Sequence, residues 1–195
     1  VPLAPDSVPV ADDVVFDEDS ELLDRLAADD ETAFRMLVER HIDRAYAIAL
    51  RIVGNAADAE DVVQDTMLKV WSHRGRWQHG RAKFSTWLYR VISNRCIDLR
   101  RKPRNENVET VPEVADGQPG AVEIIARNEL NDMLELAMQR LPEQQRIAVI
   151  FSYHENMSNG EIAQVMDTTV AAVESLLKRG RQQLRQLLRK HERDI

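Results

Sequence analysis

The residues of this chain best suited to binding chemistry are ten basic side chains and four aromatic rings between positions 74 and 104. Basic side chains bind phosphate and aromatic rings stack on unpaired bases, so the mixture is typical of a site for single-stranded nucleic acid. Trp71 and Trp87 fall on apolar stripes, which favours core positions over stacking. The basic side chains at 100–104 could instead form a solvated helix end, although we favour contact with phosphate. The block contains Arg74, Arg76, Arg81, Lys83, Arg90, Arg95, Arg100, Arg101, Lys102 and Arg104, with Trp77, Phe84, Trp87 and Tyr89.

A second group of binding residues lies near the end of the chain. Ser158 and Glu161 have the spacing of a capping box, in which each side chain satisfies a backbone donor at a helix start. A short apolar run follows, then a polar break at 167–169 and a long helical pattern over 170–190. Two helices joined by a tight polar turn, the second one basic, predict a helix-turn-helix whose second helix enters a DNA major groove. Its basic cluster is Lys178, Arg179, Arg181 and Arg185.

Catalytic and metal chemistry finds little support in the sequence. The five histidines are scattered without metal-ligand spacing, and there is no Gly-rich phosphate loop and no nucleophile elbow. Cys96 is the single cysteine, so no disulfide framework is possible. A small buried residue is favoured for it over a redox sensor, which needs exposure and a lowered pKa. We therefore expect a protein that is not an enzyme and that uses no cofactor and no metal.

The net charge of −7 is divided unevenly along the chain. Residues 69–104 carry +10 and residues 136–195 carry +2, whereas 1–35, 36–68 and 105–135 carry −9, −3 and −7. A footprint on phosphates depends on local rather than net charge, so this distribution is compatible with DNA binding. The acidic segments would repel DNA or occupy a basic surface on a partner.

Membrane insertion is not expected. No apolar run approaches the ~18 residues of a membrane span. The chain does not open with a basic start and an apolar stretch, the pattern of a signal peptide. We therefore expect a cytoplasmic protein with no membrane insertion of its own.

The scaffold expected for these binding residues is all-α. The aromatic content is only 5%, Gly and Pro are few, and apolar residues recur at helical spacing. Helices are expected from Ser20, over 31–53, over 58–72 with Asp58 as its cap, and from about Ser85 to Pro103. A basic loop covers 73–83. Further helices are expected over about 122–140, after Pro142, and in the helix-turn-helix.

These elements predict two helical domains joined by an acidic flexible linker. The domains cover residues 20–103 and 122–195. The linker covers 104–121, which loses helical period and gains Asn, Glu, Pro and Gly. Residues 1–19 are acidic and lack helical period, so they are expected to form a disordered extension.

Three motifs in this order resemble those of the extracytoplasmic-function (ECF) sigma factors. The runs 58–71 and 84–102 resemble sigma region 2, and Leu141-Pro142 followed by the helix at 161–163 resembles region 4. The resemblance covers about residues 20–190. It implies an alternative sigma factor, a dissociable subunit that directs core RNA polymerase to a specific set of promoters. Region 4 would read the −35 element as duplex, and region 2 would melt and capture the −10 element.

The helix at 58–72 carries the residues that would bind polymerase. Asp58, Asp61 and Asp65 recur at spacings of three and four and so share one face, with Gln64 beside them. A solvated acidic face is the alternative from the residues alone. The resemblance implies a docking surface for the clamp helices of core polymerase.

The resemblance also implies a site for the −10 element. The loop 73–83 and the start of helix 84–102 would hold a flipped base of the non-template strand, because a base read on its pairing edge has to leave the stack first. Asn94 matches a family position in this pocket, and its amide can both donate and accept. The residues expected here are Arg81, Lys83, Tyr89, Arg90, Asn94, Arg100, Arg101 and Lys102.

The −35 site implied by the resemblance lies on the second helix of the helix-turn-helix. Family members usually carry Lys or Arg after the valine that matches Val173, but here that residue is Glu174. A carboxylate in the groove can accept from cytosine N4. Gly180 replaces the usual alanine and costs roughly 1 kcal/mol of helix propensity. The residues expected to contact DNA are Thr169, Glu174, Ser175, Lys178, Arg179 and Arg181.

The expected partners are core RNA polymerase, promoter DNA and, as is usual in this family, an anti-sigma factor. Two other classes of protein fit these residues less well. A stand-alone helix-turn-helix repressor or activator needs a dimer and a palindromic site, and it leaves the motifs at 58–102 unexplained. An interaction protein such as an anti-sigma antagonist has little need of ten basic side chains beside aromatic rings.

Overall fold

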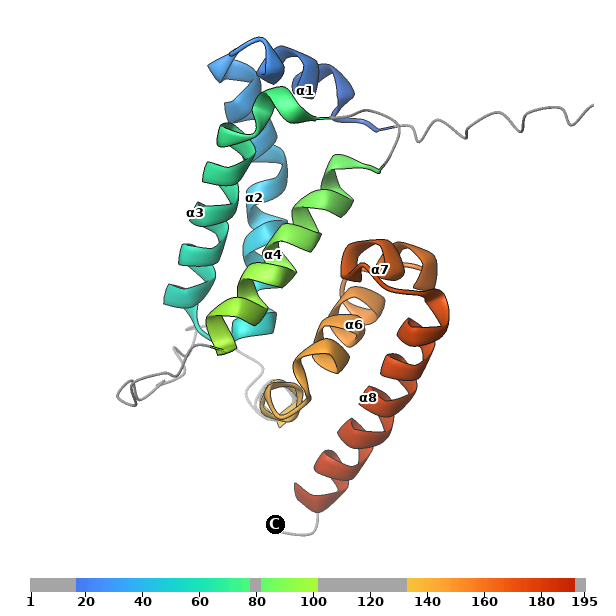
Figure 1. The fold of residues 1–195 in the computed structure, drawn as a ribbon. Helices are drawn as coiled ribbons and strands as arrows, with labels where there is room; N and C mark the ends of the chain where they lie inside the picture. The colour runs from blue at the N-terminus through green and yellow to red at the C-terminus, as the bar shows by residue number, and fades with distance from the viewer. Residues whose placement is uncertain (1–16, 78–81, 102–132, 192–195) are drawn as a thin grey trace, which may run out of the picture.

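The computed structural model describes residues 17–77, 82–101 and 133–191, and the regular elements among these residues are all helices, with no strand (Figure 1). The all-α prediction is therefore confirmed. Most of the expected N-terminal extension, the linker at 104–121 and the start of the helix at 122–140 lie outside the described residues. No helix among those described is long and apolar enough to cross a bilayer.

The first helical unit contains four α-helices and one short 3-10 turn. The helix α2 runs through its centre, and α1, α3 and α4 pack against it. Side chains at helical spacing face inward, among them Leu37, Ile48, Val62, Leu88 and Ile92, all of which are at most 1% exposed. The elements are α1 (Ser20–Ala27), α2 (Glu31–Val53), α3 (Ala56–Ser72), η1 (Arg74–Arg76) and α4 (Phe84–Arg101).

The ends of α2 and α3 follow from local chemistry. The Asp30 side chain accepts from the N–H groups of Thr32 and Ala33, which otherwise lack partners at the start of α2. Gly54 ends α2 in the left-handed conformation, at φ 85°. Asn55 then caps α3 by accepting from the N–H of Asp58. The prediction that Asp58 caps this helix was therefore wrong, since the cap lies three residues earlier. The sequence misled because Asn and Asp are both common capping residues.

Residues 17–19 fasten the start of the described chain to α2 and α4. The Asp17 carboxylate accepts from the N–H of Phe84 at 2.8 Å, which satisfies a donor at the start of α4. The Asp19 carboxylate is buried and contacts His41 Nε2 at 2.7 Å and the Arg40 guanidinium. Burial raises the pKa of Asp19, but His41 and Arg40 outweigh it and hold the pKa below the usual value.

The second unit contains helical residues 133–139, α6 (Glu143–Tyr153), α7 (Asn159–Met166) and α8 (Val170–His191). The predicted capping box is present: the Ser158 hydroxyl accepts from the N–H of Glu161, whose carboxylate accepts from the N–H of Ser158. Those bonds from Ser158 lower the pKa of Glu161. Asp167 ends α7 in the left-handed conformation, so α8 leaves at an angle. This is the predicted helix-turn-helix.

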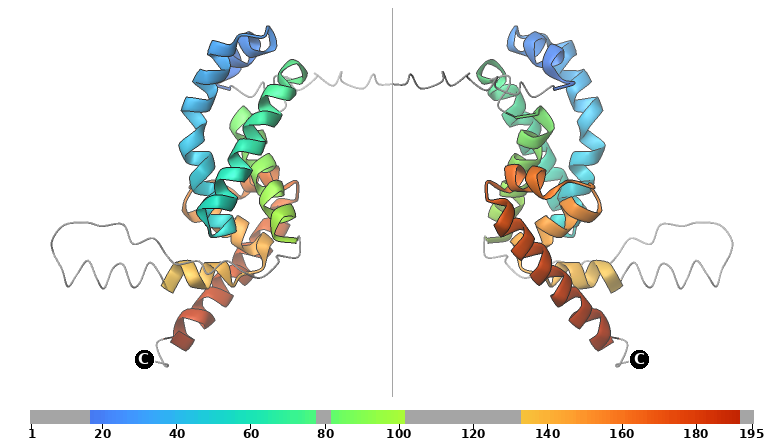
Figure 2. Two further views of the ribbon diagram at one scale, coloured as in Figure 1. Left: turned by 90° about the vertical axis from the view of Figure 1, so that its left-hand side faces the viewer. Right: turned by 90° about the vertical axis from the view of Figure 1, so that its right-hand side faces the viewer.

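The two units pack against each other (Figures 1 and 2). The helix α4 contacts α7, and α2 contacts α6. The rings of Tyr89 on α4 and Phe151 on α6 stack at 6.1 Å with an interplanar angle of 30°. Buried apolar residues of both units therefore form one continuous cluster.

Candidate nucleic-acid interface

The helix α4 presents only part of the predicted −10 set to solvent. Lys83, Asn94, Arg100 and Arg101 are exposed, and the Arg90 side chain is 38% exposed. Tyr89 is 2% exposed, and burial raises the pKa of its phenol. In this arrangement its ring lies against Phe151 and is not open to a DNA strand. The remaining two predicted residues, Arg81 and Lys102, lie outside the described residues.

Several cations of the 74–104 block are engaged inside the protein. Arg95 pairs with Asp65 on α3 at 2.6 Å, and Arg100 donates to the carbonyl of Ile52 at 3.1 Å. Arg90 forms an ion pair with Asp167 in the turn of the helix-turn-helix. The block is thus partly structural, and its exposed members are the ones suited to phosphate contact.

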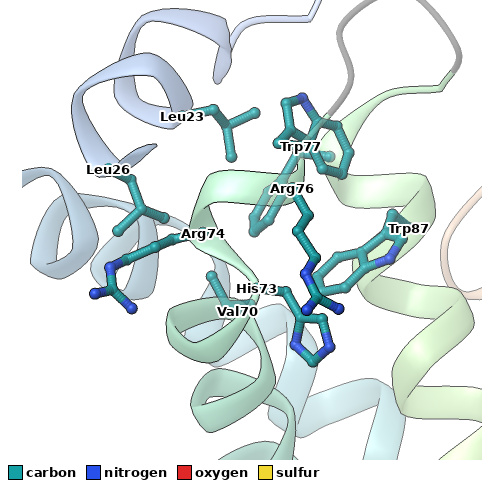
Figure 3. Close-up of a pocket in the computed structure, with 9 residues that line it drawn as sticks. Leu23, Leu26, Val70, His73, Arg74, Arg76, Trp77 and Trp87 are labelled. Atoms are coloured by element: carbon teal, nitrogen blue, oxygen red, sulfur yellow. The ribbon is translucent and has the colours of Figure 1, made fainter. Parts of the chain in front are cut away.

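An aromatic cluster lies at the start of α4. The rings of Trp77, Phe84 and Trp87 contact one another at 5.6–6.0 Å. They line a cavity of about 140 Å³ together with His73 and Arg76, and Figure 3 shows both of these side chains beside Trp87. The indole N–H of Trp77 is buried and has no hydrogen-bond partner among the described residues. The Phe84 and Trp87 rings are stacked, and Trp77 meets both of them edge-on. Aromatic rings and cations gathered in this way suit an unpaired base.

The two tryptophans placed in the core by sequence are half-buried. Trp71 packs against Phe34 at 5.2 Å, and the Arg74 guanidinium lies 4.4 Å from its ring centroid. Trp71 therefore has a structural role, as the apolar stripe indicated. Trp87 packs against the core as well, but it also lines the cavity.

The predicted docking face on α3 divides into two pairs. Asp61 and Gln64 are exposed. Asp58 accepts from the side chain of Asn55 at 2.6 Å, and Asp65 is paired with Arg95. Only the first two are therefore fully presented to a partner.

Beside Gln64 lies an apolar groove that the sequence did not reveal. It has a volume of about 590 Å³ and runs between α2 and α3. Leu68 is 59% exposed there and Ile42 is 37% exposed. Exposed apolar side chains gathered in one groove mark a contact surface. The lining residues are Phe34, Val38, Ile42, Asp43, Tyr46, Glu60, Val63, Gln64, Met67 and Leu68.

The first turns of α8 carry the predicted −35 set. Val173 is 0% exposed and holds the helix against the core, whereas Glu174 and Ser175 are exposed. The Thr169 hydroxyl accepts from the N–H of Ala172 at 3.2 Å and caps the helix. The other exposed members are Lys178, Arg179 and Arg181.

The structure explains why Gly180 stands at a helical position. A Cβ on this residue would lie 3.0 Å from Cγ2 of Val149 on α6. Gly180 therefore permits a close approach of α8 to α6, which offsets its poor helix propensity.

Cys96 is 0% exposed, and burial raises the pKa of its thiol to about 12. A thiol that stays protonated and buried is a poor nucleophile. The core role that the sequence favoured is therefore the one that the geometry supports.

Comparison with known proteins matches both units to described families. Residues 37–106 match the family described as Sigma-70 region 2, and residues 131–184 match that described as Sigma-70, region 4. ECF RNA polymerase sigma factor SigM of Mycobacterium tuberculosis is 31% identical over 173 residues, which cover 87% of this chain and 84% of that protein. SigE of Mycolicibacterium smegmatis, also an ECF RNA polymerase sigma factor, is 35% identical over 159 residues. These cover 80% of this chain but only 61% of that protein.

A solved structure of similar fold is that of CnrH in complex with the cytosolic domain of CnrY. It is 30% identical, superposes with a TM-score of 0.67, and covers 89% of this chain and 99% of CnrH. Both helical units are included in a match of that extent.

Proposed function

This chain belongs to the ECF family of RNA polymerase sigma factors, and from that premise we propose how its parts divide the work of promoter recognition. It is an alternative sigma factor that directs core polymerase to a specific set of promoters, and it is not an enzyme. We assign residues 20–103 to the region 2 domain, 104–121 to a linker and 122–195 to the region 4 domain. Residues 1–19 form an acidic extension.

Region 4 reads the −35 element with the exposed face of α8. The observation that carries this proposal is the helix-turn-helix: five predicted contact residues are exposed along α8 and Thr169 caps its start, while Val173 on the same helix is buried. A helix held this way fits a major groove, and its cations can contact phosphates on either side. Lys178 and Arg179 provide charge, and Glu174 and Ser175 face the bases.

This assignment is tested with alanine variants in run-off transcription. Lys178→Ala and Arg179→Ala should lower transcription from promoters that need the −35 element. Arg189→Ala is the matched control, because it removes an exposed cation from the far end of the same helix. Equal losses in all three variants would contradict a local −35 surface.

Region 2 captures the −10 element with the aromatic cavity and the exposed face of α4. The cavity formed by Trp77 and Trp87 supplies stacking surface, and the unpartnered indole N–H of Trp77 supplies a donor. Lys83 directly precedes α4, and Asn94 is exposed farther along that helix. Asn94→Ala should reduce permanganate reactivity of unpaired thymines at the −10 element, whereas Asp98→Ala, exposed on the same helix, should not.

Core polymerase docks on α3 and on the groove between α2 and α3. Asp61 and Gln64 provide polar contacts, and Leu68 provides apolar area next to them. Leu68→Glu should abolish co-elution with core polymerase because a charge would be buried in the contact. Met36→Glu changes an exposed apolar residue of α2 outside the groove and should leave co-elution intact. Equal effects of the two would contradict the docking site.

The chain acts in the cytoplasm, where polymerase is found, and is restrained there by an anti-sigma factor. Both statements rest on family membership. The decisive experiment for the whole proposal is reconstitution: the purified chain should co-elute with core polymerase and support run-off transcription from a mapped promoter. Tight and specific DNA binding as a dimer, without transcription, would favour a repressor instead.

A further inference from the structure

The helix α4 begins beside the aromatic cavity, and the residue before it cannot cap it. The first N–H groups of an α-helix have no partner within the helix. Lys83 precedes α4, but its side chain contains only donors, and the first turn of the helix has no acidic residue. Instead, the carboxylate of Asp17, which lies 67 positions earlier in the chain, accepts from the N–H of Phe84 at 2.8 Å. It also places a negative charge at the positive end of the helix dipole.

The N-terminal turn that carries Asp17 (residues 17–19) is fixed in its own right. The second oxygen of the Asp17 carboxylate accepts from the N–H of Asp19 at 3.1 Å. Arg40 on α2 donates to the carbonyl of Glu18 at 3.3 Å and contacts the buried Asp19 carboxylate. Because both of its oxygens are engaged and the turn is tied to the central helix, Asp17 presents a fixed acceptor to the start of α4.

Asp19 reaches the same residue of α4 by a second route, through His41. His41 Nε2 lies 2.7 Å from the Asp19 carboxylate, and its ring meets the Phe84 ring edge-on with the centroids 5.2 Å apart. All three side chains are buried, so water has little access to these contacts. The N-terminal turn therefore holds both the backbone and the ring of Phe84.

Phe84 transmits this constraint to the aromatic cavity. Its ring stacks on that of Trp87 at 5.9 Å and meets that of Trp77 at 5.6 Å. All three rings line the cavity of about 140 Å³, as do Leu23 and Leu26 of α1, which begins directly after the turn (Figure 3). A binding site has to be held within about 0.5 Å of its productive geometry. The residues that hold Phe84 are therefore in a position to control what the cavity can receive.

We propose that the N-terminal turn positions the −10 site: Asp17 and Asp19 hold Phe84, and through it the aromatic cavity, in the geometry that receives an unpaired base. The inference rests on the role in −10 capture proposed above for this cavity. The two carboxylates act as positioning residues and need not touch DNA, since their bonds are to Phe84 and to α2. The alternative is that the turn only adds stability, in which case any lost cap of similar strength should have the same effect.

The test compares two aspartates that cap helices of the same unit. Asp17→Ala removes both accepting oxygens, and Asp17→Asn keeps one of them. Asp30→Ala is the matched control, because the Asp30 side chain also accepts from two N–H groups, those of Thr32 and Ala33, and pairs with Arg25. None of these partners lies on α4. Loss of either cap should lower the stability of the unit to a comparable extent.

The geometry of the cavity is measured by fluorine NMR on the free full-length chain labelled with 5-fluorotryptophan. Each resonance is assigned with a Trp→Phe variant. Asp17→Ala should shift or broaden the resonances of Trp77 and Trp87, and Asp17→Asn should do so less. Trp71 packs against Phe34 outside the cavity and should not respond. Unchanged Trp77 and Trp87 resonances in Asp17→Ala would overturn the proposal, whatever the behaviour of the holoenzyme.

The control should give the reverse pattern in the same spectra. Asp30 accepts through its carbonyl from the N–H of Phe34, whose ring contacts Trp71, so Asp30→Ala acts on the first turn of α2. Its effect should appear at Trp71 and not at the two cavity tryptophans. If both variants disturb all three resonances alike, the turn acts only through general stability.

DNA capture is measured with holoenzyme reconstituted from core polymerase, using labelled single-stranded −10 DNA from a promoter mapped by its transcription start. If the positioning is worth as much as a typical helix cap, Asp17→Ala lowers the affinity about fivefold. Asp17→Asn should recover part of the loss, and Asp30→Ala should bind as the wild type does. Co-elution with core polymerase should be the same for all.

Two results of the binding experiment would contradict the positioning role. One is wild-type affinity in Asp17→Ala, and the other is an equal loss in Asp17→Ala and Asp30→Ala. Run-off transcription by the wild-type holoenzyme tests the proposed function separately. If the wild type transcribes and Asp17→Ala captures the strand equally well, the inference fails and the proposed function stands.

Discussion

Glu174 is the exposed residue of α8 that most sets this chain apart from the usual family pattern. It follows the fully buried Val173, so its position on the outward face of the helix is fixed. A carboxylate there can accept from cytosine N4 or can act only as a negative charge. The two roles have different consequences for sequence preference.

We predict that Glu174 reads one base pair of the −35 element. A good base contact is worth about 1–3 kcal/mol of discrimination against the wrong base. Glu174→Ala should therefore relax the preference at one position, and Glu174→Lys should shift it toward guanine on the contacted strand. The measurement is binding or transcription across a library of −35 sequences.

A remote charge would behave differently at this position. Removing it should tighten binding to every sequence alike, because repulsion of phosphates does not depend on the bases. A uniform gain in affinity, with no change in the preferred base, would contradict the reading role of Glu174.

Among the helices, α6 contributes the most deeply buried cation of the described chain. Arg146 is 1% exposed and donates to the carbonyls of Ile52, Gln139 and Leu141. Burial, with the nearby charge of Arg100, lowers its pKa to about 10, so it remains protonated at neutral pH. It ties the turn before α6 to the end of α2.

Replacing Arg146 should destabilise the protein strongly. Arg146→Met keeps much of the volume but leaves buried carbonyl groups without donors, at a cost of about 1–3 kcal/mol for each group that water cannot reach. We expect a loss of about 3 kcal/mol in the free energy of unfolding, measured by urea denaturation. Arg140→Met, at an exposed position of the same segment, should change it by less than about 0.5 kcal/mol.

The free energy of unfolding should depend on pH through the buried Asp19 carboxylate, which contacts His41 and Arg40 on α2. Its folded pKa lies below the usual value of 3.8, so the stability it contributes is present above that value and is lost as pH falls through the folded pKa. Asp19→Asn should cost about 1–3 kcal/mol at pH 7, because the hydrogen bonds to His41 and Arg40 are charge-assisted. Unfolding curves of both proteins at pH 7 and at successively more acid pH measure this, and the difference should shrink as the pH falls through the folded pKa of Asp19. If the difference between the two proteins stays constant with pH, Asp19 does not stabilise the fold through its ionised form.

The helices could be predicted from sequence because their signals are local. The capping box of Ser158 and Glu161 and the apolar period of α2 each lie within a few turns of chain. The start of α3 was misplaced, since Asn55 and Asp58 are both capping types and only the geometry decides between them. The order and type of the described helices followed the prediction.

The relation between the two units could not be predicted in this way. The contact of Arg44 with Glu155 joins residues 111 positions apart, and no local pattern marks either partner. The position of Tyr89 could not be predicted either. It lies among basic residues in the sequence, which suggested DNA contact, but its ring packs against Phe151. The groove at Leu68 was missed because it depends on how α2 and α3 pack.

At the scale of the whole molecule, charge is the feature that sequence reveals best. The basic block at 69–104 is followed by residues 105–135, which carry a net charge of −7. Most of this acidic segment lies outside the described residues. From the family resemblance we expect this segment to thread polymerase near the path of nascent RNA, where an acidic chain would resemble the RNA backbone.

We predict that neutralising Glu106, Glu109, Glu113 and Asp116 weakens initiation. The four carboxylates would be attracted to a basic channel, and their amide variants would lose that attraction while keeping the chain length. Run-off transcription should fall, whereas binding of the free variant to duplex −35 DNA should not. The control neutralises Asp6, Asp12, Asp13 and Asp194, which lie near the ends of the chain, and so changes the net charge by the same amount. If both sets lower transcription alike, only total charge matters, and if neither does, the acidic segment has no part in initiation.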